Sequence, residues 1–285
     1  MPVITVFNQK GGVGKTTTCL NLAAALKRRE RQPLLIDLDP QAHLTHITGV
    51  VVAGSSDSIY GFYQKSHQLA ELIQDAGKLG QIIPSHLGLA KADTLFGKGY
   101  NVVTRLATGL RREGLNQEQK PVIIDCSPML GVLSLNALFA CDFALIPIST
   151  DYLSLNGALQ VEKTLKALEQ VLKRRLTRRY LLTRFDKRRK MTHQILAQAQ
   201  DKFGDDLCRT TIAENVSVAE SPAVYKDIFA HAPHSRGAQD YEALLEELVS
   251  AGLIAGSNPQ PTESQEIEAE KMAYTLSPRL ACTAS

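Results

Sequence analysis

The chain has 285 residues, of which 44% are apolar, and its formal net charge is only +3, which suits one large α/β domain or two small ones with a full core. Its five cysteines are scattered with no Cys-x-x-Cys pair, which favours reduced thiols in a cytosol over a disulfide framework or a zinc site. No stretch approaches 18 uncharged apolar residues, which argues against a transmembrane span, and a first strand at Val3 leaves no room for a signal peptide.

Short apolar runs alternate with helical patterns along the chain. The expected strands are 3–7, 34–38, 81–84, 122–125, 143–148 and 180–183. The expected helices are 15–29, 58–62, 68–76, 102–112, 155–176, 192–202 and 238–251. This alternation predicts a doubly wound, mostly parallel sheet with helices on both faces, as one domain over residues 1–255. Residues 256–285 are rich in Gly, Ser, Pro and acidic residues, and we expect a disordered acidic tail there.

A glycine-rich turn follows the first strand, and residues 9–17 read QKGGVGKTT. Glycines let successive backbone N–H groups converge on phosphate oxygens, and the next helix adds its positive N-terminal end. Gln9 stands where the ordinary P-loop pattern has glycine, so that pattern is missed by one residue. We expect Lys15 to contact the β- and γ-phosphates and the Thr16 hydroxyl to ligate Mg²⁺. The predicted nucleotide contacts in this loop are Lys10, Gly11, Gly12, Val13, Gly14, Lys15, Thr16 and Thr17.

The additional lysine at position 10 gives the loop a more specific signature. The run from Lys10 to Thr17, together with 34–41 (LLIDLDPQ) and 122–128 (VIIDCSP), resembles the ParA/MinD ATPases, and the resemblance is closest to the ParA (Soj-like) branch. It covers about residues 2–250. The resemblance implies a P-loop NTPase fold, ATP and Mg²⁺ as ligands, and ATP hydrolysis that is slow without a partner. It also implies an ATP-dependent homodimer, in which Lys10 reaches the nucleotide of the other chain.

Three aspartates end the apolar strands that precede the switch segments. Ligands of doubly wound sheets bind at the carboxyl ends of strands, which favours a site there. The resemblance gives Asp39 the task of orienting the attacking water, so that Lys10, Lys15 and Asp39 are the predicted catalytic residues. Asp37 and Gln41 are predicted nucleotide-site residues of the first switch, although a strand-end cap remains an equal alternative for Asp37. Asp125 is expected to touch Mg²⁺ through a water.

In the ParA/MinD ATPases a Pro-x-Asn segment contacts the adenine base, and this chain has Ala213-Glu214-Asn215 at that place. The resemblance implies that Asn215 contacts the adenine edge, whereas packing on the ring is weakened by Ala213. Asn136 matches a family residue that contacts nucleotide across the dimer, but an inward-facing polar helix residue is the open alternative.

Ten Lys/Arg residues lie between Lys173 and Lys190 against one acidic residue, which suggests a polyanion partner. The resemblance implies that the dimer binds DNA without sequence preference through this segment. The alternative is a solvated helix end whose cations complement the helix dipole. The predicted DNA contacts are Arg175, Arg178, Arg179, Arg184, Lys187, Arg188, Arg189 and Lys190.

Together these features predict a cytoplasmic, nucleoid-associated ATPase that positions or segregates a plasmid, a chromosome origin or a protein body. A ParB-like or cargo-adaptor protein is expected to stimulate its hydrolysis. The predicted last helix is acidic, which disfavours a membrane mode. A MinD-like regulator of division or flagella and an ATP-dependent biosynthetic ligase on the same fold remain alternatives.

Overall fold

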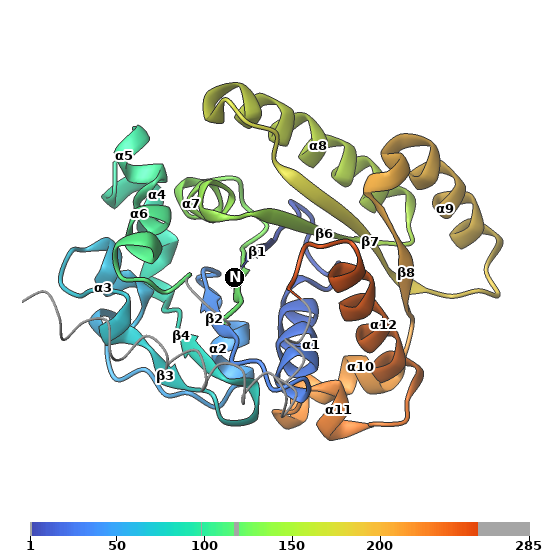
Figure 1. Cartoon of the computed structure of the whole chain (residues 1–285), viewed down its shortest axis with the longest axis horizontal. Coiled ribbons are helices and arrows are strands. Elements are labelled where there is room, and N and C mark those ends of the chain that lie inside the picture. The colour runs from blue at the N-terminus through green and yellow to red at the C-terminus, as the bar shows by residue number, and fades with distance from the viewer. Residues whose placement is uncertain (1, 98, 117–119, 256–285) are drawn as a thin grey trace, which may run out of the picture. The chain divides into compact units, whose positions relative to one another are not determined.

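An eight-stranded sheet organises residues 2–97, 99–116 and 120–255, which the computed structural model describes (Figure 1). The predicted tail at 256–285 lies outside the described residues. The strand order is β3-β4-β2-β5-β1-β6-β7-β8, and every neighbouring pair is parallel except β3 with β4. The strands are β1 (Val3–Val6), β2 (Leu34–Asp37), β3 (Gln74–Asp75), β4 (Gln81–Ile83), β5 (Val122–Asp125), β6 (Phe143–Ser149), β7 (Thr177–Phe185) and β8 (Leu207–Ala213).

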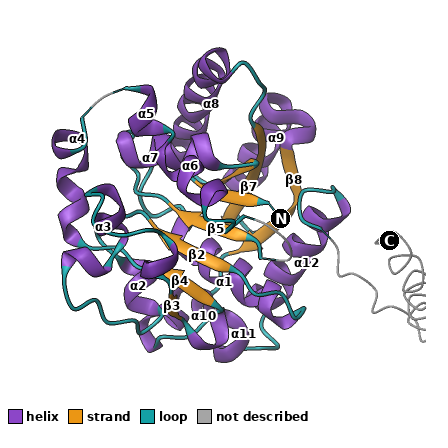
Figure 2. Cartoon of the chain, turned by 60° about the vertical axis from the view of Figure 1, so that its left-hand side comes forward, coloured by secondary structure: helices purple, strands orange, loops and turns teal. Residues whose placement is uncertain are grey.

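Helices cover both faces of this sheet, as predicted (Figures 1 and 2). One face packs against α3, α6, α7, α8 and α9, and the other against α1, α2, α11 and α12. The longer helices are α1 (Lys15–Arg28), α6 (Arg105–Arg112), α7 (Val132–Ala140), α8 (Tyr152–Leu172), α9 (Lys190–Phe203) and α12 (Arg236–Ser250). The shorter ones are α2 (His43–Ile47), α3 (Ile59–Tyr63), α4 (Ala92–Leu95), α5 (Tyr100–Val103), α10 (Val216–Glu220) and α11 (Ile228–His231).

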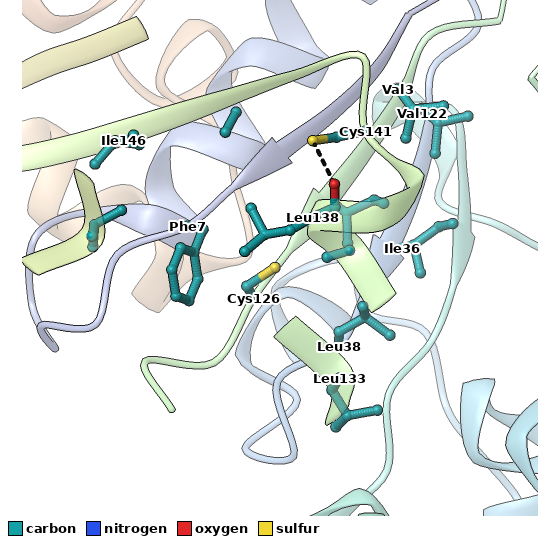
Figure 3. Packing of buried hydrophobic residues seen from close by; sticks show 14 of the residues in the cluster. Val3, Phe7, Ile36, Leu38, Val122, Cys126, Leu133, Leu138, Cys141 and Ile146 are labelled. Carbon is teal, nitrogen blue, oxygen red and sulfur yellow. Dashed lines mark hydrogen bonds between the residues drawn. The ribbon is translucent and has the colours of Figure 1, made fainter. Parts of the chain in front are cut away.

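The central strands are buried on both faces, which explains why they read as unbroken apolar runs. Figure 3 shows one side of this core, where Phe7, just after β1, and Ile36 of β2 pack in one cluster with Leu133 and Leu138 of α7. The register aligns Val6 and Asp37 with Asp125, so β1, β2 and β5 end side by side. This shared edge carries the glycine-rich loop after β1 and the segment after β2.

Two predicted helices are wrong in part. Residues 68–76 form a 3₁₀ turn at Ala70–Leu72 followed by the antiparallel strand β3, rather than a helix. Residues 102–112 are divided into α5 and α6, which meet at Thr104. Among the described residues, no helix has both the length and the apolar character that crossing a bilayer requires.

The boundary between α8 and β7 is also different from the prediction. The helix ends at Leu172, because Lys173 adopts a left-handed conformation with φ of 55°. The strand begins at Thr177 and pairs with β6 from Phe143 to Ser149. Arg178 and Arg179 therefore belong to a strand, and they do not extend the C-terminal end of a helix.

Candidate functional site

The loop between β1 and α1 has the geometry of a phosphate cradle. Gly12 and Gly14 have φ of 74° and 91°, a region that side-chain-bearing residues rarely adopt. Gly14 caps α1, so the positive N-terminal end of this helix faces the loop. The first turn of α1 holds no acidic side chain that would offset this partial charge. The Lys15 ammonium donates to the Lys10 carbonyl at 3.0 Å, and burial lowers the pKa of Lys15 while Asp125 and Asp39 oppose this shift.

A cavity of about 800 Å³ opens over this loop. The volume lies within the range of sites for nucleotide-sized ligands. Most of the predicted contacts line it, namely Gly11, Gly12, Val13, Gly14, Lys15, Thr16, Thr17, Asp39, Gln41, Ala213 and Asn215. The sheet thus brings together residues more than 200 positions apart in the sequence. Lys10, Asp37 and Asp125 are not part of the cavity wall.

Asp37 braces the switch segment and has no exposed surface. One carboxylate oxygen accepts from the Asp39 amide at 3.0 Å, and the other accepts from the amide and hydroxyl of Thr45 at 2.9 and 2.7 Å. Burial raises the pKa of Asp37 to about 6, although these hydrogen bonds oppose the shift. Asp37 therefore holds the switch segment from the end of β2, as a strand-end cap does, and its expected place near the Mg²⁺ waters stays a prediction.

Asp125 is a buried carboxylate with no hydrogen-bonding partner of normal geometry in the described part of the chain. Burial and the nearby Asp37 raise its pKa to about 8, while the Thr16 hydroxyl and Lys15 lower it. A hydrated magnesium ion prefers oxygen ligands, so the unpaired Asp125 carboxylate near the Thr16 hydroxyl fits such an ion. Asp39 lines the cavity itself, half-buried, and accepts from the Gln41 amide at 3.0 Å.

Lys10 points away from the cavity within its own chain. Its ammonium lies 2.6 Å from Asp151 Oδ1 and 2.6 Å from Ser154 Oγ, at the start of α8. Burial alone would raise the pKa of Asp151, but hydrogen bonds from Lys10, Ser149 and Ser154 outweigh it and hold this pKa well below its usual value. Asp151 was not identified from the sequence, although an aspartate between an apolar strand and a helix is a typical N-cap.

The segment after β8 forms the far wall of the cavity. Asn215 uses its Oδ1 to cap α10 by accepting from the Ser217 amide at 2.8 Å. The Ala213 amide donates to Asp240 Oδ2 at 2.9 Å, and Asp240 in turn pairs with Arg236 at 2.8 Å. The prediction missed this anchor, because Asp240 lies on α12, 27 residues beyond Ala213. Asn136 is fully buried: its side chain accepts a hydrogen bond from the Leu106 amide and donates to the carbonyls of Val102 and Val132. These contacts agree with the alternative of an inward-facing polar helix residue.

The basic segment is divided by β7. This strand has nine residues and spans about 30 Å, at ~3.3 Å per residue. Arg175 lies before it, at the edge opposite the cavity, whereas Lys187 and Lys190 follow it at the cavity edge. The segment 184–190 is exposed except for Phe185 and the half-buried Asp186. The predicted DNA contacts therefore do not form one continuous surface.

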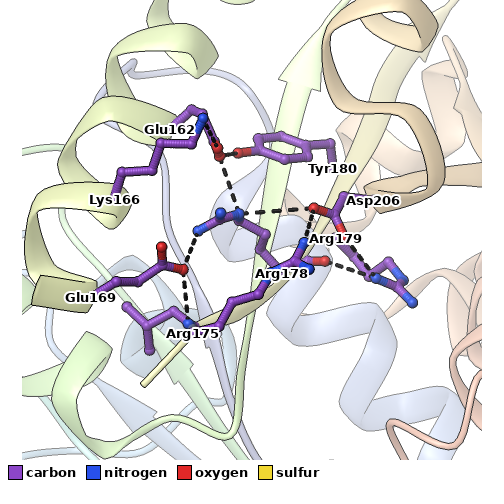
Figure 4. Close-up of polar contacts among 9 residues, drawn as sticks. Glu162, Lys166, Glu169, Arg175, Arg178, Arg179, Tyr180 and Asp206 are labelled. Carbon is purple, nitrogen blue, oxygen red and sulfur yellow. Dashed lines mark hydrogen bonds and ion pairs between the residues drawn. The ribbon is translucent and has the colours of Figure 1, made fainter. Parts of the chain in front are cut away.

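Arg178 is 4% exposed, so its prediction as a surface DNA contact is wrong. Figure 4 shows its guanidinium between α8 and the 3₁₀ turn before β8, where it pairs with Glu162 at 3.1 Å and Glu169 at 2.8 Å. The Tyr180 hydroxyl also donates to Glu162. Arg175 and Arg179 pair with Asp206 at 2.9 and 3.3 Å. This cluster holds α8 against β7, a structural role that charge counting could not separate from polyanion binding.

Comparison with known proteins agrees with this geometry. The model of the AAA domain family matches residues 1–178. The chain is 35% identical over 249 residues to the chromosome partitioning protein ParA of Myxococcus xanthus, a match that covers 87% of each chain. It is 33% identical to the sporulation initiation inhibitor protein Soj of Bacillus subtilis, over 88% of this chain and 99% of Soj.

A solved structure extends the comparison to the fold. Cobyrinic acid a,c-diamide synthase of Mycobacterium smegmatis, with bound ADP and magnesium, superposes with a TM-score of 0.76 at 26% identity. The match covers 91% of this chain and 98% of the synthase. The chain belongs to the ParA/MinD family of P-loop ATPases, on its ParA (Soj-like) branch.

Proposed function

We propose that this protein binds ATP and Mg²⁺ in the 800 Å³ cavity and hydrolyses ATP slowly. The observation that carries the proposal is the phosphate cradle of residues 11–17 beside an unpaired buried carboxylate, Asp125. The solved relative with ADP and magnesium supports the choice of ligand. Magnesium, when held near Thr16 and Asp125, supplies charge neutralisation of the phosphates.

Different residues around the cavity bind the phosphates and position the attacking water during phosphoryl transfer. The loop amides and the Lys15 ammonium bind the phosphate oxygens, where negative charge accumulates as the terminal bond breaks. Asp39 lines the cavity on the switch segment, and its carboxylate accepts a hydrogen bond only from the Gln41 amide among the described residues. Its second oxygen is available to hold a water in line with the terminal phosphorus.

We further propose that two ATP-bound chains associate face to face, with Lys10 of each chain moving from Asp151 to the partner's nucleotide. The dimer binds nucleoid DNA through the exposed cations at the cavity edge, Lys187, Arg188, Arg189 and Lys190. Arg188 and Arg189 pair with Asp186, and Arg189 also with Glu214 at 3.4 Å, so part of this charge is neutralised. A cargo-bound partner stimulates hydrolysis and releases the DNA, which positions a plasmid, a chromosome origin or a protein body.

Light scattering on the purified full chain tests this proposal. We expect a mass of 31.2 kDa alone or with ADP, and twice that mass with Mg²⁺ and a non-hydrolysable ATP analogue. Lys15→Ala should abolish nucleotide binding and keep the protein monomeric. A wild-type protein that stays monomeric with the analogue bound, or that dimerises equally well without nucleotide, would overturn the proposal.

The similarity to the diamide synthase favours one competing function, an ATP-dependent ligase. Such an enzyme couples ATP turnover to a carboxylate substrate rather than to DNA. ATP hydrolysis that is stimulated by DNA and a partner protein supports partitioning, whereas stimulation by a small carboxylate and ammonia supports a ligase.

A further inference from the structure

Arg184 stands apart from the other cations of the basic segment, because it lines the nucleotide cavity. It precedes Phe185, which pairs with Ala213 in the sheet, and the Glu214 amide donates to the Phe185 carbonyl at 3.3 Å. Its other neighbour, Thr183, donates to the Val13 carbonyl of the phosphate loop at 2.8 Å. Arg184 therefore lies between the phosphate loop and the wall formed by residues 213–219.

The backbone at Arg184 is held in an unusual conformation. Its φ is 53°, in the left-handed region that non-glycine residues rarely occupy. The Thr150 hydroxyl donates to the Arg184 carbonyl at 2.7 Å and fixes this conformation. Backbone conformations of this kind are retained where the surrounding structure holds them, and they cluster at ligand sites.

The side chain of Arg184 is exposed and has no hydrogen bond or ion pair with any other described residue. Arg188 and Arg189, in contrast, are held by Asp186 at 2.9 and 3.3 Å. Arg184 is thus a free guanidinium at the rim of the cavity.

The wall near Arg184 offers a base no flat aromatic surface among the residues described. Ala213 replaces a ring-bearing proline, and Tyr241, although it lines the cavity, is only 1% exposed. His43 lines the cavity from α2, outside the wall formed by residues 213–219. A planar guanidinium can stack on an aromatic face, and so can replace the missing surface.

We propose that Arg184 is a base-binding residue, whose guanidinium stacks on the purine ring of the bound nucleotide. This inference rests on the proposed nucleotide site and removes Arg184 from the DNA-binding set. Stacking acts on the base alone, whereas a general charge effect acts on the phosphates. The two can therefore be separated with a ligand that has phosphates but no base.

Calorimetric titration with ATP and with inorganic tripolyphosphate, both with Mg²⁺, tests the proposal. Arg184→Ala should weaken ATP binding by about three- to tenfold and leave tripolyphosphate binding unchanged. Arg184→Lys keeps the charge but loses the planar group, so it should behave like the alanine variant. Lys163→Ala, which removes an exposed cation of α8 outside the cavity lining, is the control and should alter neither ligand.

Each result has a separate meaning. If ATP affinity is unchanged in Arg184→Ala, or if ATP and tripolyphosphate lose equal affinity, the base-binding role is overturned while the nucleotide site stands. If wild-type protein binds neither ligand, the proposed function itself fails. Melting temperatures within about 1 °C of wild type would show that the variants are folded.

Discussion

Lys10 and Asp151 form an ion pair within one chain, with 2.6 Å between Nζ and Oδ1. Asp151 also caps α8 by accepting from the Ser154 amide at 2.9 Å, and it accepts from the hydroxyls of Ser149 and Ser154 at 2.7 Å. The carboxylate therefore keeps three hydrogen bonds when Lys10 departs. Both side chains of the pair are partly exposed, so separating them costs little. The ion pair with Asp151 is therefore only a weak restraint on the position of the Lys10 side chain.

Removing that restraint should favour the proposed dimer. Asp151→Asn keeps an N-cap residue for α8 but loses the negative charge. A partly exposed ion pair contributes up to about 1 kcal/mol, so the ATP concentration for half-maximal dimerisation should fall about two- to fivefold. Analytical ultracentrifugation over an ATP series measures this shift. Lys10→Ala is the control that should not dimerise, and weaker dimerisation of Asp151→Asn would contradict the restraint.

The effect of Asp151 should be independent of pH in the neutral range. Its pKa is lowered in the folded chain, so its stabilising contribution is complete above the ordinary carboxyl pKa of about 4. The contribution is lost only as pH falls through the lowered folded value. The difference in dimerisation between wild type and Asp151→Asn should thus be the same at pH 6 and pH 8.

Asp39→Ala should separate dimerisation from hydrolysis. The change leaves the phosphate loop and Lys10 intact but removes the carboxylate that faces the cavity. Loss of a group that positions the attacking water lowers turnover by about 10²- to 10⁴-fold. The variant should bind ATP, remain dimeric and dissociate from DNA more slowly than wild type in surface plasmon resonance. Dissociation at the wild-type rate would argue that Asp39 does not position the water.

The gathering of these residues around one cavity was predictable because its signals are local. Phosphate-loop glycines and strand-end aspartates are readable from short patterns, and parallel pairing of β1, β2 and β5 brings them to one edge. The restraint on Lys10 was not predictable, because Asp151 lies 141 residues away and no pattern links the two. The same holds for Asp240, which reaches Ala213 from another helix.

Charge counting failed where topology decides exposure. Arg178 and Lys187 belong to the same basic run, but Arg178 is buried on β7 in an ion-pair cluster, whereas Lys187 lies in the exposed turn after this strand. The alternating pattern of Arg178, Tyr180 and Leu182 is typical of a strand, yet the preceding amphipathic helix obscured it. The partners Glu162 and Glu169 lie on α8, seven residues apart, and therefore share one helix face.

Variants of Arg178 and Lys187 should accordingly have opposite phenotypes. Arg178→Ala leaves Glu162 and Glu169 without their cation in a largely buried site, so the free energy of unfolding should fall by about 3 kcal/mol. Lys187→Ala should leave that free energy unchanged but reduce by about one the slope of log affinity for DNA against log salt. Urea unfolding and fluorescence anisotropy at several salt concentrations measure the two effects.

A second surface variant should change DNA affinity in the opposite direction to Lys187→Ala. Glu214 is 44% exposed and pairs with Arg189, so it opposes polyanion binding. Glu214→Gln should strengthen DNA binding while Lys187→Ala weakens it. If neither change alters DNA affinity, the cavity-edge cations are not the DNA surface.

Asp125 makes the ligand-free protein less stable as the pH rises. Burial raises its pKa to about 8, whereas a carboxyl in the unfolded chain titrates near ~4. The folded chain therefore holds a proton that the unfolded chain has lost, and the stability from this site decreases between about pH 4 and 8. Asp125→Asn is neutral at every pH and avoids this loss.

Calorimetric melting with a chelator and no nucleotide measures the difference. Asp125→Asn should melt above wild type at pH 7.5, by about 2–4 °C for each kcal/mol of relieved penalty, and by less at pH 5. With Mg²⁺ and an ATP analogue the order should reverse, because the ionised carboxylate then stabilises the hydrated cation and the asparagine does not. A variant that melts below wild type without ligand would show that Asp125 is stabilised by the fold rather than held for a metal.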